Sequence, residues 1–264
     1  MSDPWSRSRG TGEESPLRAR REEMRLYGVN AVRALFERRP EALRKLYLSD
    51  ARAGRFGDVM KWCAANRVGY RVVPDDDLRK LAGSSHHEGV VADVLRTPPS
   101  ALADWLRGLP AGPACAIWLD GVGNPHNLGA ILRSAAHFGV AGLLVPDSGE
   151  LQLSGAAARV AEGGAESVAM VQAGAAAKTL DALRAAGFVP VATLVEGGSD
   201  PFSMPLPDRL VYVMGAERSG MDRRLADACD LRVSIAGTGA VESLNVAAAT
   251  AVLLAAWSAR RSAS

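Results

Sequence analysis

The chain has 264 residues, with 48% hydrophobic and 23% charged residues, which are ordinary values for a globular protein of one large or two small domains. No apolar run reaches the roughly 20 residues of a membrane-spanning helix, and no apolar signal core begins the chain. The three cysteines are far apart and lack metal-ligand spacing, so we expect thiols in a reducing compartment and no metal site. These features predict a cytoplasmic protein without a membrane partner.

The net charge of +2 conceals an asymmetry along the chain. Residues 25–96 carry 14 Lys/Arg against 9 Asp/Glu, whereas residues 114–264 carry 11 against 14. A basic first half joined to a mildly acidic second half favours contact between the first half and a polyanion. An ordinary solvated surface explains the same charge count equally well.

The first part of the chain reads as a tail followed by a small α/β domain. Residues 1–24 mix Ser, Gly, Pro, Arg and Glu with few apolar positions, which predicts a disordered tail. The patterning of residues 25–96 predicts, in chain order, a helix at 29–37, a strand at 43–48, a helix at 56–66, a strand at 70–73, a helix at 75–82 and a strand at 90–94. Residues 97–113 are punctuated by Pro and Gly, so we predict a linker with a short helix around Trp105.

The second part, residues 114–264, alternates short apolar runs with helical patterns. Strands are expected at 116–120, 142–146, 166–171, 188–194, 210–215 and 231–236. Strands that alternate with helices predict a parallel sheet covered on both faces. The last expected helix, residues 243–259, is apolar on every side, so we expect it to be buried in the core or against another subunit.

Three polar segments fall at expected strand-to-helix turns, the places where open parallel sheets bind ligands. They are residues 119–140, 210–221 and 235–257, and their most prominent polar residues are Asn127, Arg133, Glu217, Ser243 and Asn245. Ordinary structural roles are available too, because Asn127 and Ser243 could cap helices and Arg133 could be a solvated charge. Neither Gly-rich segment fits a dinucleotide-binding or P-loop fingerprint, which argues against a Rossmann cofactor site on these residues.

Taken in order, the three segments resemble the signature motifs of a known family. The patterns are N-x-G-x-I-x-R-x-A at 127–135, G-x-E-x-x-G at 215–220 and E-S-L-N-V-A at 242–247. Together they resemble the SpoU (TrmH) family of the SPOUT superfamily of knotted methyltransferases, from about residue 117 to the C-terminus. Residues 161–171 are similar to the family's Gly-Ala segment. Residues 26–37 and 86–94 resemble the accessory RNA-binding domain of the members that methylate a guanosine of large-subunit rRNA.

The resemblance implies a fold, a reaction and a set of site residues. The implied fold is α/β, with a C-terminal parallel-sheet domain that contains a trefoil knot and forms a homodimer. The implied reaction transfers a methyl group from S-adenosylmethionine to a ribose 2′-hydroxyl of RNA, with rRNA as first choice and tRNA as second. The implied cofactor contacts are Thr193, Gly215, Ile235 and Leu244. The implied catalytic or substrate-facing residues are Arg133, Asn127, Glu217, Ser243 and Asn245.

Arg133 carries the central part of the implied chemistry. The family assigns this arginine the role of general base, but a guanidinium stays protonated in proteins. Stabilising the developing alkoxide, or orienting the flanking phosphate through a bidentate contact, is physically easier. In this interpretation Asn127 and Asn245 fix the arginine and the ribose, and Glu217 helps to position Arg133.

Two departures from the family pattern keep alternatives open. Arg218 stands where the family usually has a small residue, and residues 235–237 read Ile-Ala-Gly in place of the commoner Ile-Pro-Met. One alternative is a non-catalytic RNA-binding or ribosome-assembly factor on a methyltransferase scaffold. Another is a base methyltransferase of the same superfamily. The complete polar set favours an enzyme over the first alternative, and the motif order argues against the second.

Overall fold

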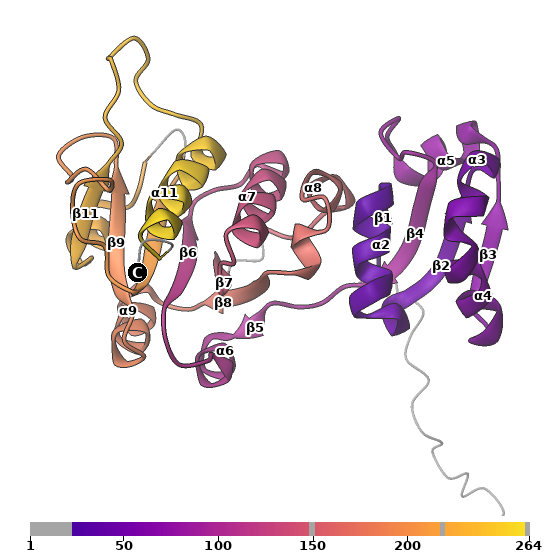
Figure 1. Cartoon of the computed structure of the whole chain (residues 1–264), viewed down its shortest axis with the longest axis horizontal. Helices are drawn as coiled ribbons and strands as arrows, with labels where there is room; N and C mark the ends of the chain where they lie inside the picture. Colours follow the sequence, from indigo (N-terminus) through magenta and orange to yellow (C-terminus); the bar gives the residue numbers. More distant parts are fainter. Residues whose placement is uncertain (1–22, 148–150, 217–219, 262–264) are drawn as a thin grey trace, which may run out of the picture.

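The computed structural model describes residues 23–147, 151–216 and 220–261. It contains two β-sheets joined by an extended connection (Figure 1). The smaller sheet has the strand order β1-β4-β2-β3, and the larger has the order β11-β9-β10-β6-β7-β8-β5. Over these described ranges, no helix is long and apolar enough to cross a membrane. The expected α/β class, with a small N-terminal unit before a parallel sheet, is confirmed.

The small domain is a four-stranded sheet with helices on both faces. Its strands are β1 (Glu23–Tyr27), β2 (Leu43–Leu48), β3 (Gly69–Val72) and β4 (Val90–Leu95). Its helices are α2 (Val29–Arg38), α3 (Asp50–Ala53), α4 (Gly57–Ala65) and α5 (Asp75–Ala82), with 3-10 turns η1 (Pro40–Ala42) and η2 (Gly54–Phe56). Leu35 of α2 and Val59 of α4 pack into the core on one face, and Leu78 of α5 packs on the other. Each predicted element of this domain is confirmed to within one residue at its ends.

Strand β1 corrects the prediction of a disordered tail over residues 1–24. Glu23 and Met24 belong to this strand, while residues 1–22 lie outside the described residues. Met24 pairs with Val94 in the antiparallel ladder between β1 and β4, and its side chain is buried. The partner strand is about 70 residues away in the sequence, so local patterning gave little sign of the pairing.

The predicted linker, residues 97–113, is partly built into the large domain. Strand β5 (Ser100–Ala101) pairs with β8, and the short helix expected around Trp105 is confirmed as α6 (Leu102–Gly108). The Trp105 indole is buried and its Nε1 donates a hydrogen bond to the Ala141 carbonyl at 3.1 Å. The part of residues 97–113 that lies outside regular secondary structure is therefore shorter than the predicted linker, and the exact division into domains stays a proposal.

The large domain is a parallel sheet whose strand order reverses at β6. Its other strands are β6 (Ala114–Asp120), β7 (Gly142–Pro146), β8 (Ala169–Ala173), β9 (Val189–Leu194), β10 (Arg209–Gly215) and β11 (Leu231–Ser234). Its other helices are α7 (Pro125–His137), α8 (Gly155–Val160), α9 (Ala176–Ala185), α10 (Arg223–Asp227) and α11 (Val246–Arg261), with the 3-10 turn η3 (Gly164–Glu166). Helices α7 and α11 share a core on one face, and α6, α9 and α10 cover the other. The trefoil knot that the resemblance implies stays a prediction.

Candidate active site

Four neighbouring strands bring the predicted site residues to one edge of the large sheet. Strands β11, β9, β10 and β6 are adjacent and parallel, so their carboxyl ends lie together. Thr193 and Gly215 lie at the ends of β9 and β10, and Ile235 directly follows β11. The turn after β6 leads into α7, which carries Asn127 and Arg133.

A side-chain hydrogen bond connects the first predicted motif to the third. Asn245 Nδ2 donates to Asn127 Oδ1 at 3.1 Å, across 118 residues of sequence. Asn245 Oδ1 also accepts hydrogen bonds from the backbone N–H groups of Ala247 at 2.9 Å and Ala248 at 3.4 Å, at the start of α11. The two amide groups are thereby held together where α7 and α11 begin.

The first residues of α7 and α11 show that neither Asn127 nor Ser243 caps a helix, contrary to the structural roles considered for them from the sequence. Asn124 caps α7, because its side-chain oxygen accepts a hydrogen bond from the His126 N–H at 2.9 Å. Asn127 is therefore not the cap, and it is buried in the first turn of the helix. Helix α11 begins at Val246 rather than at Ser243, and Asn245 supplies the oxygen for its first N–H groups. Ser243 is exposed in the preceding loop.

Arg133 projects from the middle of α7 and is exposed. Its neighbours Ile131 and Leu132 are fully buried, so the helix is fixed to the core on the other side. Among the described residues Arg133 makes no hydrogen bond or ion pair. Its guanidinium is accordingly available to an incoming phosphate or ribose oxygen.

The described ends of the second motif, Ala216 and Gly220, are hydrogen-bonded to each other after β10. Ala216 N–H donates to the Gly220 carbonyl at 3.0 Å, and Gly220 N–H donates to the Ala216 carbonyl at 2.9 Å. A Cβ atom at Gly215 would lie 2.7 Å from the Gly220 carbonyl carbon, so this position excludes side chains. Glu217 and Arg218 lie outside the described residues, and the role predicted for Glu217 stays a prediction.

The predicted cofactor contacts are uncharged. Thr193 uses its hydroxyl to tie two strands together, since Oγ1 donates to the Val213 carbonyl at 2.8 Å. Ile235 is half-buried and packs against the core beneath α11. These residues present backbone and apolar surface without a positive charge, which is compatible with the predicted contact to the positively charged sulfonium of S-adenosylmethionine.

Exposed apolar side chains mark the same edge of the sheet. Leu244 is 48% exposed, and two residues that sequence reasoning missed, Val195 and Val241, are 56% and 72% exposed. They lie in the loops that follow β9 and β11. Large apolar groups left in water at the ends of parallel strands fit a site that an adenosine group covers. The available signal was their apolar character within otherwise Gly-rich or polar loops.

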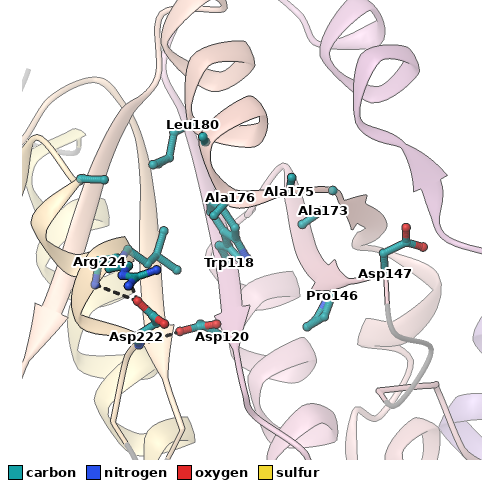
Figure 2. A pocket seen from close by; sticks show the side chains of 14 residues that line it. Trp118, Asp120, Pro146, Asp147, Ala173, Ala175, Ala176, Leu180, Asp222 and Arg224 are labelled. Carbon is teal, nitrogen blue, oxygen red and sulfur yellow. Dashed lines mark hydrogen bonds between the residues drawn. The ribbon is translucent and has the colours of Figure 1, made fainter.

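A separate cavity of about 650 Å³ lies between the carboxyl ends of β6, β7 and β8 and the helices α9 and α10 (Figure 2). Asp120 and Asp222 lie together on one side of it, where the Asp222 N–H donates to Asp120 Oδ2 at 3.0 Å, and Asp147 lies on the other. Sequence reasoning missed these residues, and none of the predicted site residues lines the cavity. Three aspartates and one arginine, Arg224, line it, and this excess of negative charge disfavours RNA phosphates. Across the described part of the chain, no group of three or more His, Cys, Asp or Glu residues could hold a metal ion.

Two curated relatives cover most of this chain. An uncharacterized tRNA/rRNA methyltransferase, YfiF, of Escherichia coli is 39% identical over an alignment of 274 positions, which covers 96% of this chain and 79% of the relative. A 23S rRNA (guanosine-2'-O-)-methyltransferase, RlmB, of Nitrosomonas europaea is 35% identical over 231 residues, which cover 87% and 88%.

Solved structures share the fold over nearly the whole chain. The SpoU methyltransferase AviRb of Streptomyces viridochromogenes, in complex with AdoMet, has a TM-score of 0.75 at 24% identity, with 94% of both chains covered. The AdoMet-bound rRNA methyltransferase of Sinorhizobium meliloti has a TM-score of 0.76 at 22% identity, with 92% and 89% covered.

Two family models match the chain, one for each sheet. The model described as RNA 2'-O ribose methyltransferase substrate binding matches residues 25–99. The model of the SpoU rRNA Methylase family matches residues 114–255, which contain strands β6 to β11 of the large sheet and all three motifs. The chain belongs to the SpoU rRNA methylase family.

Proposed function

We propose that this protein uses S-adenosylmethionine to methylate a ribose 2′-hydroxyl in structured RNA, with rRNA as the substrate. The observation that carries the proposal is the hydrogen bond between Asn127 and Asn245, which assembles two motifs at the start of the helix that bears Arg133. The RlmB relatives, whose name gives 23S rRNA as substrate, favour rRNA over tRNA.

Thr193, Gly215, Ile235 and Leu244 would hold the cofactor at the carboxyl edge of the sheet. When bound, S-adenosylmethionine supplies an activated methyl group. The AdoMet complexes of two proteins that share this fold support the assignment. The exposed face of Leu244 fits the role, because a bound adenosine would remove that apolar surface from water.

The chain's polar residues would orient the ribose and stabilise charge on its 2′-oxygen. Arg133, exposed on α7, can donate to the developing alkoxide or hold the adjacent phosphate. Asn127 and Asn245 keep a fixed mutual geometry, which suits the near-attack arrangement that a displacement reaction needs. Ser243, in the exposed loop before α11, and Glu217 complete the proposed polar set.

RNA binding is proposed to depend on both the small domain and a second copy of the chain. The net positive charge of residues 25–96 supplies phosphate contacts, which makes affinity fall with salt. Helix α11 supports a homodimer, since its apolar residues Ala248, Ala251, Val252 and Ala255 recur on one stripe and stay at least partly exposed. The homodimer would form through the large domain.

Transfer of a labelled methyl group tests this function. The protein would be incubated with tritiated S-adenosylmethionine and total RNA from a strain that lacks the gene, and the RNA would then be separated by size. We expect label in rRNA, and its loss in Arg133→Ala with cofactor binding retained. Label in tRNA alone would overturn the rRNA assignment. If the unmodified protein neither transferred label nor bound the cofactor, the proposal that it is a methyltransferase would be contradicted.

A further inference from the structure

A short segment of the large domain lies between the small domain and the helix that carries Arg133. This segment, residues 151–166, contains α8 and η3 and is called the joint below. In Figure 1 it lies between α7 on one side and β1 and α2 on the other, and residue contacts join it to all three. The orientation of the joint therefore affects the positions of both α7 and the small domain.

A bidentate ion pair anchors the joint to the small domain. Arg39 Nε and Nη2 donate to the two carboxylate oxygens of Glu166 at 2.6 and 2.8 Å. The side chains are 18% and 9% exposed, so solvent screens the pair little. Arg39 Nη1 also donates to the Leu95 carbonyl at 2.8 Å, at the end of β4. One guanidinium thus connects the end of α2, the end of β4 and the joint.

Two further contacts fasten the joint to the start of α2. Arg159 Nη2 lies 3.2 Å from Glu88 Oε1, while Glu88 Oε2 accepts a hydrogen bond from the Val29 N–H at 3.0 Å. Asn30 Nδ2 donates to Glu162 Oε2 at 2.5 Å. Glu88 and Glu162 both have a positive φ, 55° and 52°, which residues other than glycine keep only where their surroundings hold them. Both carboxylates thus contact the opposite domain from positions of uncommon backbone conformation.

Glycines allow backbone contact on both sides of the joint. A Cβ atom at Gly155 would lie 2.2 Å from the Arg25 carbonyl oxygen, on the small-domain side. A Cβ atom at Gly164 would lie 2.6 Å from the Leu132 carbonyl oxygen and 3.1 Å from Arg133 Cα, on the α7 side. The joint is therefore pressed against the very turn of α7 that holds Arg133, with no side chain between them.

We infer that the joint is a rigid positioning element, which holds the small domain at a fixed orientation to Arg133. Arg39 and Glu166 are its positioning residues, and neither is part of the proposed polar set. RNA bound by the small domain is presented to Arg133 across a constant span, so the joint selects RNAs in which the anchoring region and the target ribose match that span. The selection of RNA rests on the proposed function, whereas the fixed orientation does not.

Distances between spin labels test the fixed orientation directly. Labels would be placed at Lys61→Cys in the small domain and Lys178→Cys in the large domain, both exposed positions, in a Cys229→Ala background. Dilution with unlabelled protein restricts the signal to one protomer. We expect one narrow distance distribution, which broadens in Glu166→Ala and narrows again in the exchanged pair Arg39→Glu with Glu166→Arg. A broad distribution in the unmodified protein, or no change in Glu166→Ala, would overturn the inference.

Asp58→Ala is the matched control for the loss of one ion pair. Asp58 of α4 pairs with Arg33 of α2 at 2.6 Å, and this more exposed pair lies wholly within the small domain. We expect Asp58→Ala to leave the distance distribution narrow. If Asp58→Ala broadened the distance distribution as much as Glu166→Ala does, a general loosening of the small domain would explain the result. The inference that the joint fixes the orientation would then be wrong.

The kinetics of methyl transfer to RNA test the positioning role, because a general loss of stability would not raise KM for RNA alone. In Glu166→Ala we expect kcat/KM for RNA to fall at least about tenfold, through KM, with the Kd for S-adenosylmethionine unchanged. Unchanged RNA kinetics would contradict the selection of RNA. If the unmodified protein transfers no methyl group, the proposed function fails, and the label distances still decide whether the joint is rigid.

Discussion

Asn245 serves two separate purposes through the two ends of one amide group. Its oxygen accepts from the N–H groups of Ala247 and Ala248 and so begins α11. Its nitrogen donates to Asn127, which links two motifs. The first purpose contributes to stability and the second to the proposed site, so a well-chosen substitution separates them.

Substitution of Asn245 should separate stability from activity. Asn245→Ala removes the capping oxygen, and we expect the free energy of unfolding to fall by about 1 kcal/mol. Asn245→Asp keeps a capping oxygen and loses only the donor, so its stability should fall less while methyl transfer falls as strongly. Urea denaturation measures the first effect and a transfer assay the second. Equal stability of Asn245→Ala and the unmodified protein would refute the capping role.

The Cys229 thiol should react slowly with alkylating reagents. Burial raises its pKa to about 11, with the neighbouring Asp230 carboxylate adding to the shift, because both disfavour the thiolate. Since only the thiolate reacts, alkylation by iodoacetamide should be slow at pH 8 and should accelerate up to about pH 11. Mass spectrometry of Cys229 peptides over time would follow this. A reaction at pH 8 as fast as that of the urea-unfolded chain would contradict the prediction.

Individual elements were predictable where their signal is local. Alternation and helical periodicity in the small domain placed α2, β2 and α5 to within one residue. Strand β1, strand β5 and the joint were missed, because each acquires its structure from a partner far away in sequence. The order of the motifs predicted that their residues share one edge, and the contact between Asn127 and Asn245 agrees with it. Val195, Val241 and the acidic cavity have no motif and needed the structure.

Gly164 should tolerate no side chain. A Cβ atom there would lie 2.6 Å from the Leu132 carbonyl oxygen, so Gly164→Ala forces η3 away from α7. We expect a loss of about 1–3 kcal/mol in the free energy of unfolding, as for other overpacked sites. Gly57→Ala is the control, because its Cβ would meet nothing within 4 Å. Urea denaturation measures the free energy of unfolding of both variants. If Gly164→Ala were as stable as the unmodified protein, the contact between the joint and α7 would be adaptable and not rigid.

At the scale of the whole molecule, the two sheets are joined in two ways. One is the covalent connection from β4 to β5, and the other is the joint with its ion pair between Arg39 and Glu166. The sheet order places the predicted site at the edge of the large domain, beside the exposed stripe of α11. We therefore expect RNA to contact the small domain, Arg133 and a second subunit at the same time.

The homodimer can be tested on the stripe of α11. Val252 is half-buried within a single chain, and we expect a second subunit to cover it. Val252→Glu places a charge in that contact, so the dimer should dissociate to a 27.7 kDa monomer. Ala259→Glu, at an exposed position near the end of the same helix, gives a comparison for added charge. Light scattering during size-exclusion chromatography measures the molar mass of each variant. If the unmodified protein were a monomer, the proposed homodimer would be contradicted.

Alkaline hydrolysis of the methylated RNA distinguishes methylation of the ribose from methylation of a base. Alkali cleaves RNA through the 2′-hydroxyl, so a methyl group on that oxygen protects the adjacent phosphodiester bond. After transfer of tritiated methyl groups, we expect label in alkali-stable dinucleotides, and we expect Arg133→Ala to yield none. Label recovered in mononucleotides would show methylation of a base, and would contradict the claim that this protein is a ribose 2′-O-methyltransferase.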